Sequence, residues 1–227
     1  MAITTCIFDA YGTLLDVAAA ARTAAEEPGQ AQLAECWPDI AQNWRLKQLQ
    51  YTWLRTIMED HADFWTVTGD ALDWALAAEG IEDAALRARL MELYRELGAY
   101  PEVAPMLRKL KEAGLNTAIL SNGTPEMLEA ATVSAGIRGD LDDILSVEMC
   151  GIYKPAKVVY DMVGRRFACA PEKVLFVSSN GWDAAAASAY GFTVAWANRA
   201  DEPVECLPGK PAHVLRDLSG IPALAGI

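Results

Sequence analysis

Cysteine is scarce in this sequence and is not spaced in pairs. The 227-residue chain has five cysteines, an odd number, which are far apart and include no C-x-x-C pair. A disulfide framework or a cysteine-based zinc site requires paired or closer spacing. We therefore expect neither, and we expect most of these thiols to be buried apolar side chains.

Long apolar runs and basic clusters are also missing. No uninterrupted apolar segment reaches the roughly 18 residues of a membrane-spanning helix, and no basic and apolar leader follows Met1. We expect no membrane association and a cytoplasmic protein. The net charge of -12 disfavours nucleic-acid binding, because contacts to phosphates require basic patches. A small anionic ligand would need a local cationic pocket against this overall charge.

The sequence does contain a regular alternation of strand-like and helical patterns. Its hydrophobic fraction of 52% and charged fraction of 22% are ordinary for a globular protein. Short apolar runs that predict strands lie at Ile3–Phe8, Asn116–Leu120, Ile144–Val147, Val174–Val177 and Thr193–Trp196. Helical patterns lie at Pro125–Ala135, Ala156–Phe167 and Asp183–Tyr190. This α/β alternation predicts a Rossmann-like core with a parallel sheet.

The interval between the first two predicted strands, about a hundred residues, is too long for a simple crossover. Its helical patterns predict an inserted helical cap at residues 16–98, with the core formed by residues 1–15 and 99–227. The expected cap helices are Trp44–Met58, Thr68–Glu79 and Asp83–Leu97. The two crossings, near Leu15–Val17 and Gly98–Pro101, are the expected hinges.

The predicted helix Trp44–Met58 has two contrasting sides. Its apolar side consists of Trp44, Leu46, Leu49, Tyr51, Trp53, Leu54, Ile57 and Met58. Its polar stripe consists of Arg45, Gln48, Thr52, Arg55 and Glu59. Such amphipathicity is typical of a helix that packs its apolar side and turns its charges to solvent.

Polar side chains gather where the predicted strands end. In chain order they are Asp9, Ser121, Asn122, Lys154, Ser178, Asn180 and Asp183. Taken singly, each has an ordinary explanation as a helix cap, a turn residue or a surface charge. Because the carboxyl ends of parallel strands meet at one edge of the sheet, we expect them to converge on Asp9 as a nucleophile. We also expect Asp183 to pair with Lys154.

The segment Thr5–Leu15 resembles motif one of the haloacid-dehalogenase (HAD) superfamily. In that superfamily the first aspartate, here Asp9, attacks the substrate, and in its phosphatases an aspartate two positions later protonates the leaving alcohol. Tyr11 stands at that second position. A phenol with a pKa of about 10 is a poor proton donor at neutral pH. A halide leaves as a stable anion without a proton, so the resemblance implies carbon–halogen cleavage.

The fourth motif departs from the pattern of the superfamily's Mg²⁺-dependent phosphatases. It reads Ser178–Asp183, with Ser179 near the position where a carboxylate ligand is expected. Mg²⁺ prefers several oxygen ligands, usually including carboxylates. We therefore expect no metal and no organic cofactor, with Lys154 supplying the positive charge. A Mg²⁺-dependent HAD phosphatase acting on a small phosphomonoester is the alternative, and a catalytically silent HAD-like binding protein is conceivable.

The insert resembles the lid of the L-2-haloacid dehalogenases over Trp44–Arg55, Asp63–Trp65 and Asp70–Leu72. The resemblance implies that Arg45 and Asn122 hold the departing halide and that Ser121 helps to hold the substrate carboxylate. It places around the substrate carbon chain Ala10, Tyr11, Leu46, Leu49, Phe64 and Trp182. Core packing is the simpler explanation for the two leucines. Relatives commonly carry glutamine at the position of Leu46, so the pocket is expected to be more apolar here.

The reaction that this resemblance implies is hydrolysis of short-chain (S)-2-haloalkanoic acids to (R)-2-hydroxy acids. Asp9 forms an ester with inversion at C2, and water then hydrolyses that ester. Thr13, Ser178 and Lys154 are expected to orient Asp9. Asn180, Asp183 and Lys154 are the candidates for positioning the water.

Three further expectations concern residues and partners around this site. Tyr160 matches a family tyrosine near the lysine, although it also has the spacing of a packing residue. The expected small-molecule partners are the 2-haloacid and the halide ion, and a homodimer through the lid is expected because relatives often form one. His61 and His213 lie outside every motif, which disfavours a histidine-based triad or metal site.

Overall fold

The computed structural model describes residues 2–227 and confirms the expected α/β architecture. Within these residues, one 6-stranded parallel sheet has the order β3-β2-β1-β4-β5-β6. The strands are β1 (Thr5–Phe8), β2 (Asn116–Ser121), β3 (Asp143–Ser146), β4 (Val174–Ser178), β5 (Thr193–Ala197) and β6 (His213–Leu215). All residues of β1 and β4 are buried, as expected of strands that are covered on both faces.

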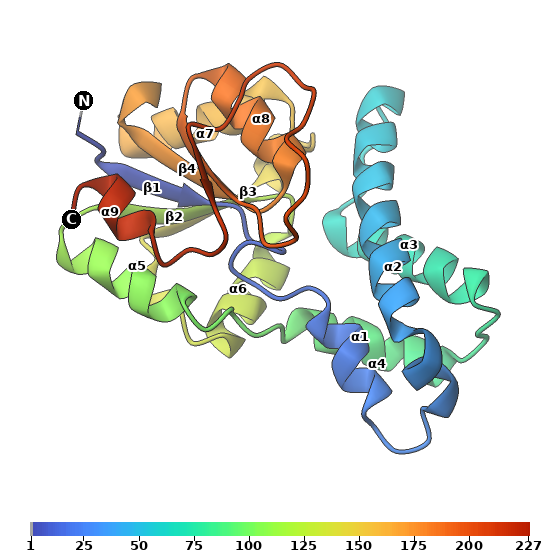
Figure 1. Ribbon diagram of the computed structural model, residues 1–227. Coiled ribbons are helices and arrows are strands. Elements are labelled where there is room, and N and C mark those ends of the chain that lie inside the picture. The colour runs from blue at the N-terminus through green and yellow to red at the C-terminus, as the bar shows by residue number, and fades with distance from the viewer. Residues whose placement is uncertain (1) are drawn as a thin grey trace.

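Helices cover both faces of the sheet. In the core they are α5 (Val103–Glu112), α6 (Pro125–Ser134), α7 (Lys157–Phe167), α8 (Gly181–Tyr190) and α9 (Ile221–Ala225). Figure 1 shows α7 and α8 on one side of the sheet and α5 and α9 on the other. This layering is the usual way in which a parallel sheet buries both of its faces.

The register of the central strands brings their carboxyl ends to one level. Phe8 of β1 is paired with Ile119 of β2 and with Val177 of β4. The residues that follow these strands therefore emerge side by side at one edge, which is where ligands bind in open parallel sheets.

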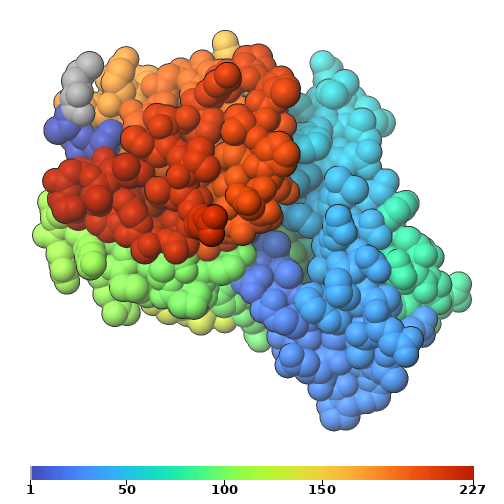
Figure 2. Space-filling model, in the orientation of Figure 1, coloured from blue at the N-terminus to red at the C-terminus, as the bar shows by residue number. Residues whose placement is uncertain are grey.

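The segment between β1 and β2 forms a helical cap beside this edge. Its helices are α1 (Ala19–Ala25), α2 (Ala31–Met58), α3 (Phe64–Ala78) and α4 (Ala84–Arg95). Figure 2 shows the cap, in blue to cyan, projecting from the core beside the red-orange C-terminal segment. The two crossings lie together, because Asp16 N donates to Gly98 O at 3.0 Å and Tyr100 N donates to Leu14 O at 3.0 Å.

The loop between α2 and α3 also contacts the core. His61 Nε2 lies 3.0 Å from Glu148 Oε2, and the backbone N–H of Phe64 donates to Glu148 Oε1 at 3.2 Å. Tyr153 donates its hydroxyl to the backbone oxygen of Ala62. The cap is thus held to the core at this loop as well as at the two crossings.

Helix α2 differs from the sequence prediction in length and in orientation. It begins at Ala31 rather than Trp44 and contains Pro38. Four of the eight residues on its predicted apolar side are exposed, namely Leu46 at 56%, Leu54 at 46%, Ile57 at 78% and Met58 at 68%, whereas Trp44 of that side is 3% exposed. Conversely, Gln48 and Thr52 of the predicted polar stripe are 1% and 0% exposed. The prediction of the buried side was wrong because this polar stripe faces the other cap helices and the core, where it finds hydrogen-bond partners.

Several elements had no sequence prediction, and one expectation about the thiols fails. The short elements α1, α9 and β6 and the amphipathic helix α5 were not expected. Of the cysteines, only Cys6 is buried, whereas Cys36, Cys150 and Cys169 are half-buried and Cys206 is exposed. Among the described residues, no helix combines the length and apolar composition needed to cross a membrane.

Candidate active site

The carboxylate of Asp9 lies at the carboxyl end of β1 and receives three hydrogen bonds. Lys154 Nζ donates to Oδ1 at 3.2 Å, while Thr13 Oγ1 and Asn180 Nδ2 donate to Oδ2 at 3.0 and 2.9 Å. The residue is only 6% exposed. Donors from three separate segments therefore fix the orientation of the carboxylate.

A tight turn after β1 brings Thr13 back onto Asp9. Gly12 has a φ of +87°, a conformation that glycine adopts without strain. Thr13 Oγ1 also accepts a hydrogen bond from Ser179 N at 2.8 Å, which ties the turn to the end of β4. The hydroxyl of Thr13 thus accepts a hydrogen bond from the segment after β4 and donates one to the carboxylate of Asp9.

Lys154 lies between two carboxylates. Its Nζ is 2.9 Å from Asp183 Oδ2 and 3.2 Å from Asp9 Oδ1, and its side chain is 1% exposed. Burial alone lowers the pKa of this lysine, but the charges of Asp183 and Asp9 outweigh that effect and raise its pKa above the ordinary value. Lys154 therefore stays charged. The expected pairing of Lys154 with Asp183 is present.

Tyr160 completes this buried chain of polar groups. Its hydroxyl donates to Asp183 Oδ1 at 2.7 Å. Burial, followed by the nearby Asp183 charge, raises the pKa of Tyr160 well above that of an ordinary phenol. The tyrosine thus remains a donor and holds the carboxylate that in turn holds Lys154. Asp183 itself lies inside α8, and the N-cap residue is Asn180.

Arg45 reaches from the cap helix α2 to the core. Its Nη2 lies 3.1 Å from Tyr11 O and 3.1 Å from Asn180 Oδ1, and its Nη1 donates to Gln48 Oε1 at 2.8 Å. Since Asn180 also donates to Asp9, a single residue separates the guanidinium from the carboxylate. Among the described residues, Arg45 is thus the cationic side chain of the cap that contacts these groups, and it lies close to the Asp9 carboxylate.

A buried polar network holds Arg45 from behind. Gln48 Nε2 donates to Thr68 Oγ1 at 2.7 Å and to the Tyr94 hydroxyl at 3.1 Å. Thr68 Oγ1 donates in turn to Phe64 O at 2.6 Å. Because each of these buried groups has a partner, the network restrains Gln48 and, through it, Arg45. The sequence offered a signal, since Gln48 follows Arg45 by one helical turn.

Tyr11 fills the space between the cap and the loop after β2. Its ring centroid lies 5.4 Å from that of Tyr94 and 5.6 Å from that of Phe64. Burial raises the pKa of Tyr11 well above 10, so the phenol stays protonated. Its hydroxyl is buried and has no hydrogen-bond partner among residues 2–227. The aromatic rings of Tyr11, Phe64 and Tyr94 therefore form an apolar wall near Asp9, and the hydroxyl of Tyr11 is a hydrogen-bond donor without an acceptor among the described residues.

The close packing of Tyr11 predicts the effect of Gly123→Ala. A Cβ at this position would lie 2.8 Å from Tyr11 Cε2 and 3.0 Å from Leu128 Cγ. We expect the free energy of unfolding to fall by about 1–3 kcal/mol, measured by urea denaturation, because the ring or the helix must move. Gly139→Ala is the matched control, since a Cβ there meets nothing within 4 Å. Equal stability of the two variants would contradict the packing argument.

Two predicted serines, Ser178 and Ser121, accept hydrogen bonds from the backbone of their own turns. Ser178 was expected to orient Asp9, but its Oγ accepts a hydrogen bond from Asn180 N at 3.1 Å, and Asn180 contacts the carboxylate instead. Accepting this bond leaves the O–H of Ser178 available as a donor, so its role in orienting Asp9 stays a prediction. Ser121 Oγ likewise accepts from Gly123 N at 3.2 Å.

Asn122 and the backbone of Ala10 fix neighbouring loops. Asn122 Oδ1 accepts a hydrogen bond from Lys154 N at 3.0 Å, which leaves the amide nitrogen as the donor of that side chain. Ala10 O accepts from Leu14 N at 2.9 Å and from Leu15 N at 3.0 Å, closing the turn that carries Thr13. These contacts place both residues in the loops beside Asp9, and their roles toward the substrate and the halide stay predictions.

A hollow of about 480 Å³ opens beside Arg45 and Asn180. Leu49, Trp53 and Trp182 form part of its wall, and the exposed Leu46 lies at its lining. Phe64, by contrast, is 1% exposed and packs on Tyr11. Ser179 and Trp53, which line this hollow, were not named as site residues because single positions in these segments carry no distinguishing pattern.

Similarity to known proteins extends over the core and the cap. A family model of haloacid dehalogenase-like hydrolases matches residues 3–191. The chain is 43% identical over 223 residues to (S)-2-haloacid dehalogenase 1 of Pseudomonas sp. (strain CBS-3), with 98% of this chain and 96% of the relative covered. The residues around Asp9 thus belong to a chain whose relatives match it over nearly its whole length.

Solved structures agree with this sequence similarity. A dehalogenase crystal structure superimposes with a TM-score of 0.92 at 42% identity, covering 98% of this chain and 96% of that chain. The structure of L-2-haloacid dehalogenase from Xanthobacter autotrophicus with chloropropionic acid covalently bound has a TM-score of 0.85 at 35% identity, with 98% of both chains covered. The arrangement of core and cap therefore has experimental counterparts.

Proposed function

Because this chain belongs to the haloacid dehalogenase-like hydrolase family, we propose that it hydrolyses short-chain (S)-2-haloalkanoic acids to (R)-2-hydroxy acids. The observation that carries the proposal is the Asp9 carboxylate, held by Lys154, Thr13 and Asn180 beneath Arg45. The 43% identity to an (S)-2-haloacid dehalogenase supports the choice of substrate.

In the first step, a carboxylate oxygen of Asp9 attacks C2 of the substrate from the side opposite the halogen. The new C–O bond forms as the C–X bond breaks, and its electron pair leaves on the halide. Backside attack inverts C2 and leaves an ester on Asp9. The relative with chloropropionic acid covalently bound supports such an intermediate.

The departing halide is stabilised by Arg45 and by the amide nitrogen of Asn122. The guanidinium of Arg45 donates to Tyr11 O and Asn180 Oδ1. In the reaction, the halide would accept hydrogen bonds from these N–H groups in place of the two oxygens. Hydrogen bonds from these donors become stronger as negative charge builds up on the halide. They therefore stabilise the transition state more than the bound substrate, which lowers the barrier. Ser121 and nearby backbone N–H groups hold the substrate carboxylate, and Tyr11, Leu49 and Trp182 enclose its carbon chain.

Gln48→Leu tests whether the buried network positions Arg45. We expect kcat to fall about tenfold, corresponding to about 1.4 kcal/mol, with a larger loss for 2-chloropropionate than for 2-bromopropionate because chloride is the poorer leaving group. Gln50→Leu, an exposed change on the same helix, is the control. Steady-state kinetics on both halides provide the measurement. Equal losses for the two halides would assign Gln48 a structural role alone.

In the second step, water attacks the carbonyl carbon of the Asp9 ester. The bond between the Asp9 carbonyl carbon (Cγ) and the ester oxygen attached to C2 breaks, so the hydroxy acid keeps that original carboxylate oxygen and Asp9 gains one from water. Lys154, Asn180 and Asp183 are the groups that we propose to position this water, and the charge of Lys154 is available to polarise the ester carbonyl. Of the two protons of the water, one passes to the departing oxygen of the hydroxy acid and the other is released.

The donor set does not suit the Mg²⁺ ion of the alternative phosphatase. The ammonium of Lys154 lies between the carboxylates of Asp9 and Asp183, at 3.2 and 2.9 Å. Ser179 contributes a hydroxyl where a carboxylate ligand would be needed. We therefore derive no step through a metal and propose a reaction that requires no metal and no organic cofactor.

Halide release from (S)-2-chloropropionate, followed with and without a chelator, tests the function. We expect release in both cases and (R)-lactate as the product. A small phosphomonoester assayed in parallel with added Mg²⁺ should not be hydrolysed. Phosphate release without halide release would replace the proposal with the phosphatase alternative.

We also propose that two copies associate through the cap. The exposed side of α2 presents Leu54, Ile57 and Met58, and α3 adds Trp74, which is 41% exposed. Contiguous exposed apolar side chains are typical of interaction sites. Sedimentation equilibrium should give the mass of a dimer, and Ile57→Glu should convert it to a monomer.

A further inference from the structure

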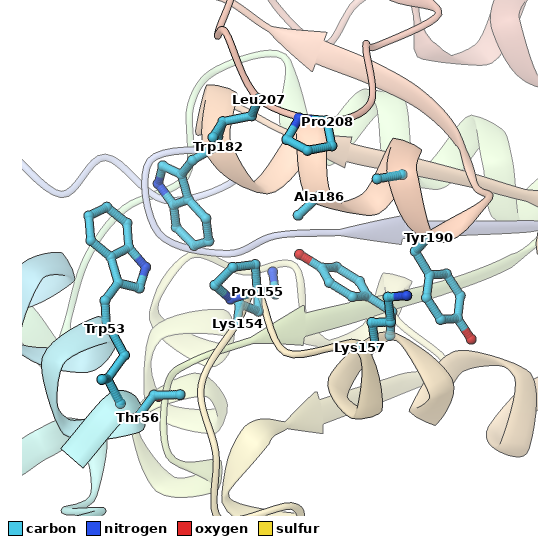
Figure 3. A pocket seen from close by; sticks show the side chains of 13 residues that line it. Trp53, Thr56, Lys154, Pro155, Lys157, Trp182, Ala186, Tyr190, Leu207 and Pro208 are labelled. Carbon is cyan, nitrogen blue, oxygen red and sulfur yellow. The ribbon is translucent and has the colours of Figure 1, made fainter. Parts of the chain in front are cut away.

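A second hollow lies beside the catalytic groups and has no role in the reaction described above. It has a volume of about 590 Å³ and lies between α2 of the cap and α7 and α8 of the core. Figure 3 shows Trp53 and Trp182 close together at one end, Tyr190 at the other and Ala186 between them. Its walls are mainly apolar and aromatic, and its volume is within the range of small-molecule sites.

The hollow adjoins the position of the substrate. Trp53 and Trp182 line both this hollow and the smaller one beside Arg45, and their ring centroids are 5.4 Å apart in an edge-to-face arrangement. Lys154, whose Nζ lies 3.2 Å from Asp9 Oδ1, also lines it. A substituent on the carbon that Asp9 attacks can therefore extend past the tryptophan pair into this space.

Unused hydrogen-bond donors distinguish this hollow from ordinary apolar packing. Trp53 Nε1, Trp182 Nε1 and Thr56 Oγ1 are buried without a partner among residues 2–227, and all three residues line it. A buried donor without an acceptor is costly. An aromatic ring offers acceptor faces to N–H groups as well as apolar surface, so it matches both properties of these walls.

We propose that this hollow binds the C2 substituent of 2-haloacids that carry an aromatic ring, such as 2-bromo-3-phenylpropanoate. The inference rests on the proposed function, because Asp9 must attack the same C2 carbon in these larger substrates. The phenyl ring lies against Trp53 and Trp182 on one side and extends toward Tyr190 on the other. The substrate range thus includes arylalkyl as well as short-chain 2-haloacids.

Ala186 offers a matched pair of substitutions for the test. It lines this hollow and not the one beside Arg45, so Ala186→Phe fills the proposed site while Ala186→Ser preserves its volume. The kcat/KM of each variant is measured with 2-bromopropionate and with 2-bromo-3-phenylpropanoate. We expect Ala186→Phe to lower the value for the phenyl substrate at least about tenfold. Its value for 2-bromopropionate, and both values for Ala186→Ser, should stay within about twofold.

A second variant and a binding measurement separate the outcomes. Leu207→Trp fills the same hollow from the loop between β5 and β6 and should reproduce the selective loss. Quenching of tryptophan emission by 3-phenylpropanoate, which has no halogen to release, reports binding without turnover. We expect saturable quenching in the unmodified protein and its loss in Ala186→Phe and Leu207→Trp.

Four results would overturn the inference or its premise. Release of bromide from 2-bromopropionate but not from the phenyl substrate would reject the aryl site and leave the function intact. Release from neither substrate would reject the function, and the quenching titration would then still decide whether the hollow binds an aryl acid. Equal losses on both substrates in both filling variants would show that the hollow is not a separate subsite. A changed oligomer mass in both filling variants, without selective loss, would assign it to contact with a second copy.

Discussion

Replacement of Asp9 by asparagine should abolish halide release while the protein stays folded. The amide has nearly the shape of the carboxylate but lacks its charge and nucleophilicity, and the neighbouring carboxylate of Asp183 is already engaged by Lys154 and Tyr160. We expect kcat to fall by at least about 10⁴-fold, the scale of losing a nucleophile. Asp39→Asn, an exposed change on α2, is the control. Stopped assays of chloride release and circular dichroism provide the measurements.

Isotope labelling gives the same prediction a direct chemical readout. In a single turnover with excess enzyme in ¹⁸O-labelled water, the label should enter the Asp9 carboxylate, because water attacks the ester at its carbonyl carbon. Mass analysis of the peptide that contains Asp9 detects it. Direct entry of ¹⁸O into the hydroxy acid in the first turnover, or normal halide release by Asp9→Asn, would contradict the covalent mechanism.

The position of the site could be predicted from sequence because strand ends are local features. A buried parallel strand appears in the sequence as a short apolar run. The polar residue that follows it lies at the same edge of the sheet as the polar residues that follow the neighbouring strands. This logic brought Asp9, Lys154 and Asp183 together, and the structure has them within hydrogen-bond distance. The long interval after β1 likewise required an inserted unit.

The orientation of α2 could not be predicted because it depends on partners from distant segments. The polar stripe of that helix read as a solvated face, yet Gln48 is buried by Thr68 of α3 and Tyr94 of α4. A sequence pattern counts apolar residues and carries no information on whether buried polar groups are paired. The same error concerns the apolar side of α2, which was expected to be buried and is partly exposed. This exposed side is the surface that we propose for the contact between two copies.

The hydrogen bonds of Ser178 and Asn180 illustrate a second limit. Ser178 ends β4 and Asn180 lies two residues later, and both side chains carry a hydrogen-bond donor. The backbone turn decides, because Ser178 Oγ accepts from Asn180 N while the Asn180 amide is directed at the carboxylate. Sequence spacing places residues at an edge but does not determine which side chain is used by the turn itself.

Replacement of Arg45 by alanine should leave the protein folded and lower kcat by about 10²–10³-fold, the cost of losing a charged donor at a developing anion. The guanidinium contacts the cap through Gln48 and the core through Tyr11 O and Asn180. Its loss removes the donor that the leaving halide uses. Arg55→Ala on the same helix is the matched control, because Arg55 forms its ion pairs with the exposed Asp60 and Asp70, away from Asp9.

Separating the two chemical steps makes the Arg45 prediction specific. Rapid-quench single turnovers should show slower ester formation in Arg45→Ala, with a greater loss for chloride than for bromide, and an unchanged rate of ester hydrolysis. Arg45→Lys should recover part of the first rate, because an ammonium supplies charge without the second donor of the guanidinium fork. A loss confined to ester hydrolysis would instead mean that Arg45 acts through Asn180 on the water, and the halide role would have to be abandoned.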